Sequence, residues 1–311
     1  MLGEGGMGTV YKARQPHLDR VVAIKTIRDR PTEDLLERFR REAKLGARLD
    51  HPAIARVLEF VESGPDAPYL VLEYVEGRPL SELAKEAPLD EDRIAELLEP
   101  VCRAISTAHE AGVLHRDLKP ANVMLRAGDD SPVVLDFGVA RDLGDEGGPT
   151  LTGAQIGTLP YMSPEQADDS KRADARSDVY SLGAILFELA TGRRPFAATS
   201  QEALVRKIFF DDPPRPTDIA PECPLDLEVM ALRCLEKDPD HRYQTAEELA
   251  DELRRFLDGE PILARPVALP VKLWRRAMRR KAMTGLAAAV ILTLAVASWA
   301  GSGSAGARAA A

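Results

Sequence analysis

The sequence contains few cysteines, and their positions suggest neither a disulfide framework nor a metal site. Only Cys102, Cys223 and Cys234 occur in 311 residues, an odd number without the short spacing of metal-binding pairs. We therefore interpret them as ordinary thiols in a reducing compartment and expect no disulfide.

Basic residues are fewer than acidic ones, 41 against 50, for a net charge of −9. Residues 271–311 reverse this balance, because they contain no Asp or Glu but hold Lys272, Arg275, Arg276, Arg279, Arg280, Lys281 and Arg308. The rest of the chain is thus strongly acidic, which is the wrong sign for neutralising a phosphate backbone. We expect no nucleic-acid partner.

The first residues also lack the basic and apolar regions of a secretory signal, and no internal repeat is found. What the chain does have is 45% hydrophobic and 29% charged residues over 311 positions. This composition predicts a globular protein with a full core and room for two lobes or domains.

A glycine cluster opens the chain, in "MLGEGGMGTVYKA". Gly3, Gly5 and Gly8 fit G-x-G-x-x-G, where the missing Cβ lets backbone N–H groups approach phosphate, although the spacing alone also fits a flexible terminus. A dinucleotide-binding loop would open a helix, whereas here β-favouring residues follow, then a turn and "VVAIKTI". We predict a glycine-rich hairpin with Lys25 on the next strand.

Hydrophobic periodicity predicts the elements that follow. Residues 31–49 are predicted to form a helix with Glu42 on its apolar stripe. The Glu42 side chain is either solvated at the edge of that stripe or, as we favour, paired with Lys25. Two strand-like runs, "ARVLEFVES" and "PYLVLEYV", precede a helix from Asp90 to Gly112 that Pro100 should bend near residue 97. The chain to about residue 258 is then mainly helical, with "DARSDVYSLGAILFELATG" as a central buried helix.

Polar residues crowd into "VLHRDLKPANVML", residues 113–125, between two apolar, strand-like ends. A second apolar strand delivers Asp136 in "VVLDFGVA". Each polar residue alone has an ordinary interpretation, such as a turn aspartate or a strand-end cap. Together, His-Arg-Asp-Leu-x-x-x-Asn and Asp-Phe-Gly occur in order after the glycine cluster and Val-Ala-Ile-Lys. Through these motifs, residues 1 to about 258 resemble the protein-kinase family, and closely resemble membrane-anchored bacterial Ser/Thr kinases of eukaryotic type.

The resemblance implies an α+β, two-lobed kinase fold that uses ATP and Mg²⁺, with Mn²⁺ as an alternative. Its small β-rich N-lobe would span about residues 1–75 and its large helical C-lobe about 76–258. Asp117 matches the base that accepts the substrate hydroxyl proton, and Lys119 the residue that neutralises the moving γ-phosphoryl group. Lys25 would hold the α- and β-phosphates while Glu42 fixes its position. Asn122 and Asp136 match the metal ligands.

The resemblance also implies a nucleotide-binding set, with Leu72 at the gatekeeper position. The set is Leu2, Gly3, Glu4, Gly5, Gly6, Met7, Gly8, Val10, Ala23, Lys25, Glu73, Val75 and Met124. Ser163, Pro164 and Glu165 replace the family's Ala-Pro-Glu, and Glu165 is expected to pair with Arg242. Asp178 resembles a buried aspartate that hydrogen-bonds the backbone of the catalytic loop.

Substrate class and regulation follow from the same motifs. Lys119 together with Thr158 favours serine and threonine over tyrosine as acceptors. Arg116 suggests a receptor for a phosphate on Thr150 or Thr152, although both threonines are also compatible with ordinary polar loop positions. The implied partners are protein substrates and a second copy of the kinase. The implied activity includes autophosphorylation.

The C-terminal part is predicted to anchor the chain. Residues 259–281 read as a Pro-containing linker with a basic juxtamembrane segment, 282–300 as an uncharged transmembrane helix, and 301–311 as a short external tail. The implied location is the inner or plasma membrane, single-pass and contacting lipid, with a cytoplasmic kinase. A helix docked on the kinase, or an amphipathic helix on a membrane surface, are the alternatives.

The residues also allow two alternative functions. The chain could be a catalytically weak, membrane-tethered ATP-binding scaffold, or a small-molecule kinase, which the Gly-Thr and Ser-Pro-Glu segment disfavours. Only Met1 and Leu2 precede Gly3, so we expect that the first strand is truncated and that the natural protein begins upstream.

Overall fold

The computed structural model describes residues 1–4, 8–27, 33–62, 68–86, 89–137 and 158–264. The chain divides into two compact units, Met1–Leu257 and Asp258–Ala311. In the second unit, the described residues 258–264 form turns and bends without a helix or strand. The elements below all belong to the first unit.

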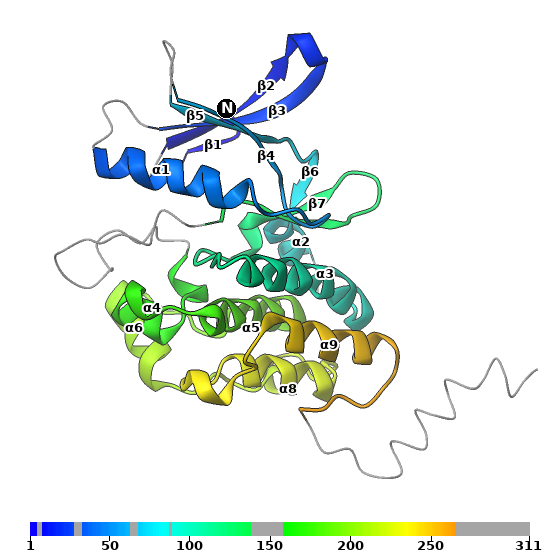
Figure 1. Ribbon diagram of the computed structural model, residues 1–311. Coiled ribbons are helices and arrows are strands. Elements are labelled where there is room, and N and C mark those ends of the chain that lie inside the picture. The colour runs from blue at the N-terminus through cyan, green and yellow to red at the C-terminus, as the bar shows by residue number, and fades with distance from the viewer. Residues whose placement is uncertain (5–7, 28–32, 63–67, 87–88, 138–157, 265–311) are drawn as a thin grey trace, which may run out of the picture. The chain divides into compact units, whose positions relative to one another are not determined.

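A five-stranded antiparallel sheet, in the order β1-β2-β3-β5-β4, forms the N-terminal part of this unit (Figure 1). Its strands are β1 (Gly3–Glu4), β2 (Gly8–Gln15), β3 (Arg20–Ile27), β4 (Val57–Val61) and β5 (Tyr69–Glu73). Gly3 on β1 lies opposite Val10 on β2, so the predicted glycine-rich hairpin is confirmed.

Gly8 is needed because β2 and β3 approach closely there. A Cβ at this position would lie 1.6 Å from the carbonyl oxygen of Thr26 on β3, which no relaxation of a side chain could relieve. Any other residue would therefore push the two strands apart next to the glycine cluster.

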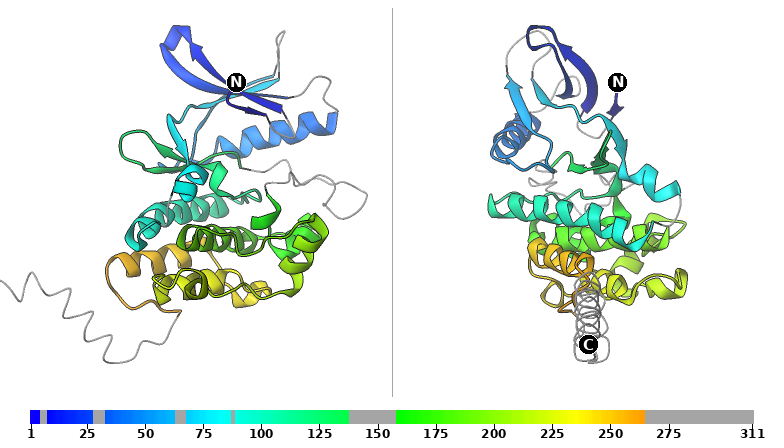
Figure 2. Two further views of the ribbon diagram at one scale, coloured as in Figure 1. Left: turned by 180° about the vertical axis from the view of Figure 1, so that it is seen from behind. Right: turned by 90° about the vertical axis from the view of Figure 1, so that its right-hand side faces the viewer.

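Helix α1 (Glu33–Gly46) lies along the five-stranded sheet, as Figures 1 and 2 both show. Phe39 and Ala43 bury their side chains against Leu70 of β5. The Phe39 ring also meets Phe60 edge to face, with ring centroids 5.9 Å apart. The helix predicted over residues 31–49 is thus confirmed in its central part.

The C-terminal part is mainly helical and includes a small antiparallel sheet in the order β6-β7-β8. Its strands are β6 (Gly77–Pro79), β7 (Val123–Arg126) and β8 (Pro132–Val134). Its helices are α2 (Leu80–Glu86), α3 (Glu91–Glu110), α4 (Pro164–Asp168), α5 (Ala175–Thr191), α6 (Gln201–Phe210), α7 (Pro216–Ile219), α8 (Leu225–Cys234) and α9 (Ala246–Leu257). Short 3₁₀ turns are η1 (Pro16–Leu18), η2 (Pro120–Asn122), η5 (Leu159–Tyr161), η6 (Ser170–Arg172) and η7 (Pro239–His241).

Helix α5 is the buried centre of this part, as its apolar sequence predicted. It contacts α3, α8 and α9, and almost every side chain after Arg176 is buried. Gly183 permits the close approach of α8, because a Cβ there would lie 2.2 Å from the Cβ of Cys234. Gly192, at φ +68°, ends the helix in the left-handed region.

Helix α3 begins directly after Asp90, close to the predicted start, with the Asp90 side chain accepting from the Arg93 N–H as an N-cap, and it continues through Pro100. Its bend near residue 97 remains a prediction. The expected strand-like end at residues 113–114 was wrong, because the Val113 N–H donates to the Ala108 carbonyl and closes the end of the helix instead. Gly112, at φ +74°, allows this turn.

The fold is therefore the expected α+β, two-lobed kinase fold, with a β-rich N-lobe and a helical C-lobe. Within the described ranges, no helix is long and apolar enough to cross a membrane. The predicted spanning segment, 282–300, lies outside the described residues, and the lobe and domain boundaries remain predictions.

Candidate active site

The loop between α3 and β7 is fixed by one buried carboxylate. Asp178, 1% exposed at the start of α5, accepts hydrogen bonds of 2.8 Å from the backbone N–H groups of His115 and Arg116. The predicted contact of Asp178 with the loop backbone is confirmed. Arg116 has a φ of +60°, an unfavourable conformation for a long side chain that this carboxylate holds in place.

His109 on α3 is a further partner of Asp178 that the sequence did not reveal. Its Nε2 lies 2.8 Å from Oδ2 of Asp178. Burial opposes ionisation of Asp178, but the hydrogen bonds from the His109 ring and from the His115 backbone N–H hold the pKa of Asp178 below its usual value. Nothing in the local pattern of α3 distinguishes His109 from a core residue, so only tertiary packing identifies it.

His115 joins the two segments that carry Asp117 and Asp136. Its Nδ1 accepts from the Asp117 N–H at 3.3 Å, so its Nε2 carries the proton and donates to the Leu135 carbonyl at 3.0 Å. Burial lowers the pKa of His115, which keeps the ring neutral. The ring also packs against Phe137, with centroids 4.8 Å apart.

Three of the predicted site residues, Lys119, Asn122 and Thr158, gather around Asp117. Lys119 Nζ donates to Oδ2 of Asp117 and to Oγ1 of Thr158, at 2.9 Å in each case. Asn122 Nδ2 donates to the Asp117 carbonyl at 2.8 Å and to its Oδ2 at 3.2 Å. The carboxylate is therefore held in one orientation by two side chains from its own loop. Thr158, 2% exposed, adds a contact from a distant segment.

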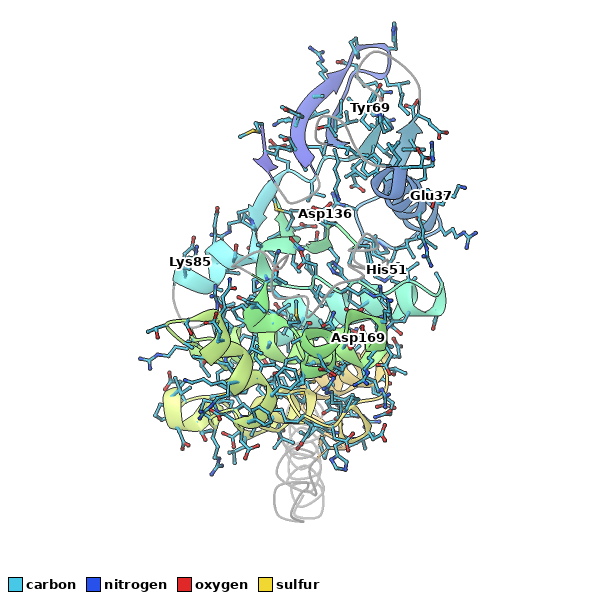
Figure 3. The ribbon with its side chains drawn as sticks, turned by 90° about the vertical axis from the view of Figure 1, so that its left-hand side faces the viewer. Glu37, His51, Tyr69, Lys85, Asp136 and Asp169 are labelled. Atoms are coloured by element: carbon cyan, nitrogen blue, oxygen red, sulfur yellow. The ribbon has the colours of Figure 1, made fainter. Side chains whose placement is uncertain are left out.

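Lys25 of the N-lobe and Asp136 of the C-lobe form an ion pair of 3.1 Å. Lys25 is 13% exposed and Asp136 is 41% exposed, and the Lys25 charge holds the pKa of Asp136 below its usual value. Figure 3 labels Asp136 at this position between the sheet and the helices. Glu42 belongs to α1, but its side chain lies outside the described residues, so its pairing with Lys25 remains a prediction.

Val10 and Ala23, two of the residues predicted to contact the nucleotide, share one face of the five-stranded sheet. Val10 lies opposite Lys25, and Ala23 opposite Leu72, and directly opposed residues point to the same face. The described residues Leu2, Gly3, Glu4 and Gly8 lie on or next to β1 and β2. Gly5, Gly6 and Met7 lie outside the described residues.

The segment that joins the lobes is pinned at Glu73. Its carboxylate accepts from Arg126 Nη2 at 2.7 Å and from the Arg56 N–H at 3.3 Å. Val75 is 6% exposed, and Met124 lies on β7. These contacts fix the start of the segment that joins the lobes.

Asn122 and Asp136 suit a hard cation, because they offer one amide oxygen and one carboxylate. Among the described residues, no group of three or more His, Cys, Asp or Glu side chains could hold a metal by itself. A cation held by one or two side chains together with substrate phosphates is the usual arrangement for Mg²⁺, so the donor set fits this ion.

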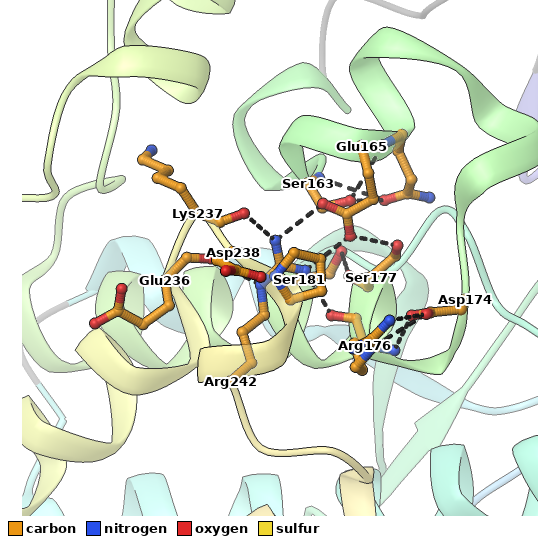
Figure 4. Close-up of polar contacts among 12 residues, drawn as sticks. Ser163, Glu165, Asp174, Arg176, Ser177, Ser181, Glu236, Lys237, Asp238 and Arg242 are labelled. Atoms are coloured by element: carbon orange, nitrogen blue, oxygen red, sulfur yellow. Dashed lines mark hydrogen bonds and ion pairs between the residues drawn. The ribbon is translucent and has the colours of Figure 1, made fainter.

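A buried ion pair supports the segment after Thr158 (Figure 4). Arg242 donates to both carboxylate oxygens of Glu165, at 2.7 and 2.9 Å, which confirms the predicted pair. Ser177 also donates to Glu165, at 2.6 Å. Ser163 and Gln166 form a capping box on α4, and Gln166 Nε2 donates to the Arg116 carbonyl at 3.3 Å. The sequence had not indicated this second link to the catalytic loop.

The proposed regulatory residues are only partly described. Thr158 and Arg116 lie in the contacts above, whereas Thr150 and Thr152 fall outside the described residues. Their modification and its effect on Arg116 remain predictions.

Comparisons with known proteins agree with this arrangement. A family profile described as "Protein kinase domain" matches residues 1–253. A probable serine/threonine-protein kinase of Streptomyces coelicolor is 43% identical over 269 residues, covering 84% of this chain and 40% of that protein. The serine/threonine-protein kinase PknB of Mycobacterium tuberculosis is 42% identical over 268 residues, covering 84% of this chain and 42% of its own. The chain thus spans about two fifths of the length of these curated relatives.

Proposed function

The chain belongs to the protein kinase family, and on that premise we propose that it transfers the γ-phosphoryl group of ATP to serine and threonine hydroxyls of proteins. The observation that carries the proposal is the contact of Lys119 with both Asp117 and Thr158. It supports an acceptor site in which a carboxylate, a cation and a threonine from a distant segment are fixed together.

In this proposal, Asp117 orients the acceptor hydroxyl and takes its proton. A carboxylate suits the task because it is ionised at neutral pH and is held here by Lys119 and Asn122. Lys119 would have a second role, in which its charge offsets the negative charge of the transferred phosphoryl group.

ATP would bind between the lobes. The glycine hairpin would cover the phosphates, Lys25 would contact the α- and β-phosphates with Glu42 fixing its position, and Val10, Ala23 and Met124 would enclose the adenine. Backbone groups of Glu73 and Val75 would contact the adenine edge. Asn122 and Asp136 would hold Mg²⁺, or Mn²⁺ in its place, which neutralises phosphate charge when bound.

The preference for serine and threonine is supported by the Lys119–Thr158 contact and by the names of both relatives. Autophosphorylation at Thr150 or Thr152 would give Arg116 a phosphate to bind in a bidentate manner. Protein substrates follow from the kinase family, and a second copy of the chain is a further candidate partner.

Membrane anchoring is proposed from sequence alone. The uncharged residues 282–300 would span the bilayer, with the basic residues of 259–281 and the kinase on the cytoplasmic side and 301–311 outside. A reporter enzyme fused after Ala311 should give the signal of an external location. A cytoplasmic signal, or release of the protein by salt without detergent, would contradict this topology.

The central test is incubation of the purified chain with radiolabelled ATP and Mg²⁺, with and without a generic basic protein, followed by mass spectrometry. We expect phosphate on serine or threonine of the added protein and of the chain itself. Lys25→Met serves as the inactive control. If the wild type transfers no more label than this variant, the catalytically weak scaffold is the correct alternative.

A further inference from the structure

A contact between Lys12 and Tyr74 bridges β2 and the segment that joins the lobes. Lys12 Nζ donates to the Tyr74 hydroxyl at 3.1 Å and lies 4.2 Å from the centroid of the same ring. The ammonium therefore combines a hydrogen bond with a cation–π contact on one side chain. None of the kinase motifs includes this pair.

The register places the pair on the face proposed for adenine. Lys12 lies opposite Ala23, and Ala23 lies opposite Leu72, so the three share one side of the sheet. Tyr74 follows Leu72 by two residues and continues the alternation just beyond β5. The Lys12–Tyr74 contact thus runs across the outer edge of this face, next to Ala23.

Tyr74 is a fixed point in the chain because its neighbours are pinned on both sides. Before it, Glu73 is held by Arg126, with an Nη2–Oε1 distance of 2.7 Å. After it, the Glu76 carbonyl accepts from the Ala127 N–H at 2.8 Å. Lys12 therefore attaches β2, which also carries Val10, to a segment anchored on the C-lobe.

We propose that Lys12 and Tyr74 form a clasp that closes the outer edge of the nucleotide site and sets its affinity for the adenosine part of ATP, a role that rests on the proposed function. The clasp fixes the distance between the Val10 side chain and the adenine ring. It acts on the nucleoside and not on the phosphates, so Lys12 and Tyr74 are positioning residues.

The alternative is that Lys12 simply attracts the negative triphosphate. Arg14 provides a matched control, because it carries the same charge on the same face of β2, two residues further on, and pairs with Asp19 on the surface. Loss of general positive charge should affect Lys12→Met and Arg14→Met alike, whereas loss of the clasp affects only Lys12→Met.

The experiment measures binding of adenosine and of ATP to the full chain by titration calorimetry, together with ATP KM and kcat. For Lys12→Met and Tyr74→Leu we expect dissociation constants about three- to tenfold higher, by the same factor for adenosine and ATP. ATP KM should rise with kcat unchanged. Tyr74→Phe keeps the ring and should fall between wild type and Tyr74→Leu, and the double variant should bind no more weakly than either single one.

The proposal is overturned if Lys12→Met weakens ATP but not adenosine, if Arg14→Met has the same effect, or if the two single effects add in the double variant. Thermal unfolding without nucleotide should be unchanged in Lys12→Met, since Lys12 is exposed. Binding is measured directly, so a wild type that binds adenosine with the expected Lys12 dependence but transfers no phosphoryl group would contradict the proposed function and leave the clasp intact.

Discussion

Lys119 connects Asp117 to Thr158, with its Nζ 2.9 Å from Oδ2 of the aspartate and 2.9 Å from Oγ1 of the threonine. The two acceptors come from separate segments. Asp117 belongs to the same loop as Lys119, whereas Thr158 lies 39 residues after Lys119. The position of the ammonium therefore depends on the segment that carries Thr158 as well as on its own loop.

Replacement of Thr158 by Val should loosen Lys119 and lower kcat by about tenfold or more, because small displacements of a charge at a reacting centre are costly. ATP KM should change little. Thr158→Ser keeps the hydroxyl and should recover most of the activity. Steady-state kinetics on both variants test this, and equal activity of the Val and Ser variants would contradict it.

Asp117→Asn should lower kcat by about 10²-fold or more, since the amide cannot accept the hydroxyl proton. Binding of ATP should remain close to wild type, because Asp117 faces the acceptor in the proposed site. Calorimetry and phosphate transfer measured on one preparation separate these effects. Turnover at the wild-type rate would rule out Asp117 as the base.

Removing one partner of the buried Glu165–Arg242 pair should strongly destabilise the fold. Arg242→Met leaves the Glu165 carboxylate buried without its guanidinium, a change that typically costs about 3–5 kcal/mol of unfolding free energy. Arg172→Met removes an exposed pair with Asp168 and should cost about 1 kcal/mol at most. Urea unfolding of both variants makes the comparison, and similar losses would show that the buried pair is not special.

Stability should fall as pH drops below about 6.5, the pKa of an unfolded histidine. Burial lowers the pKa of His115 in the folded chain, so below that pH the unfolded state binds a proton that the folded state does not. The loss from this residue approaches about 1.4 kcal/mol per pH unit until the lowered folded pKa is reached.

Comparison with His115→Phe isolates this contribution. The pKa of His51 is also lowered by burial, but His51 is present in both proteins, so its effect cancels. The variant should show a smaller loss of unfolding free energy between about pH 7.5 and about pH 5.5. Identical pH dependence of the two proteins would mean that His115 is not held neutral.

The sequence by itself determined which elements form and which residues carry chemistry. The burial of α5, the start of α3 near Asp90 and the glycine hairpin depend on periodicity and on local backbone preferences, which are properties of neighbouring residues. The order of the motifs around Lys25, Asp117 and Asp136 was sufficient to indicate a kinase. The prediction of a strand-like end at residues 113–114 was wrong, because the Val113 N–H closes the end of α3. An apolar pair can either begin a strand or close a helix, and composition does not distinguish the two.

Only the tertiary structure decided which side chains support those residues. Asp178 reaches His115 across 63 positions, and Lys12 reaches Tyr74 across 62, so both contacts depend on how separate elements pack and on strand register. His109 and Gln166 are invisible to pattern analysis for the same reason, since a hydrogen bond between distant segments leaves no periodic trace in either one. Local signals fix an element's type, whereas partners across the core are selected by the single packing that buries the apolar surfaces and satisfies the buried polar groups together.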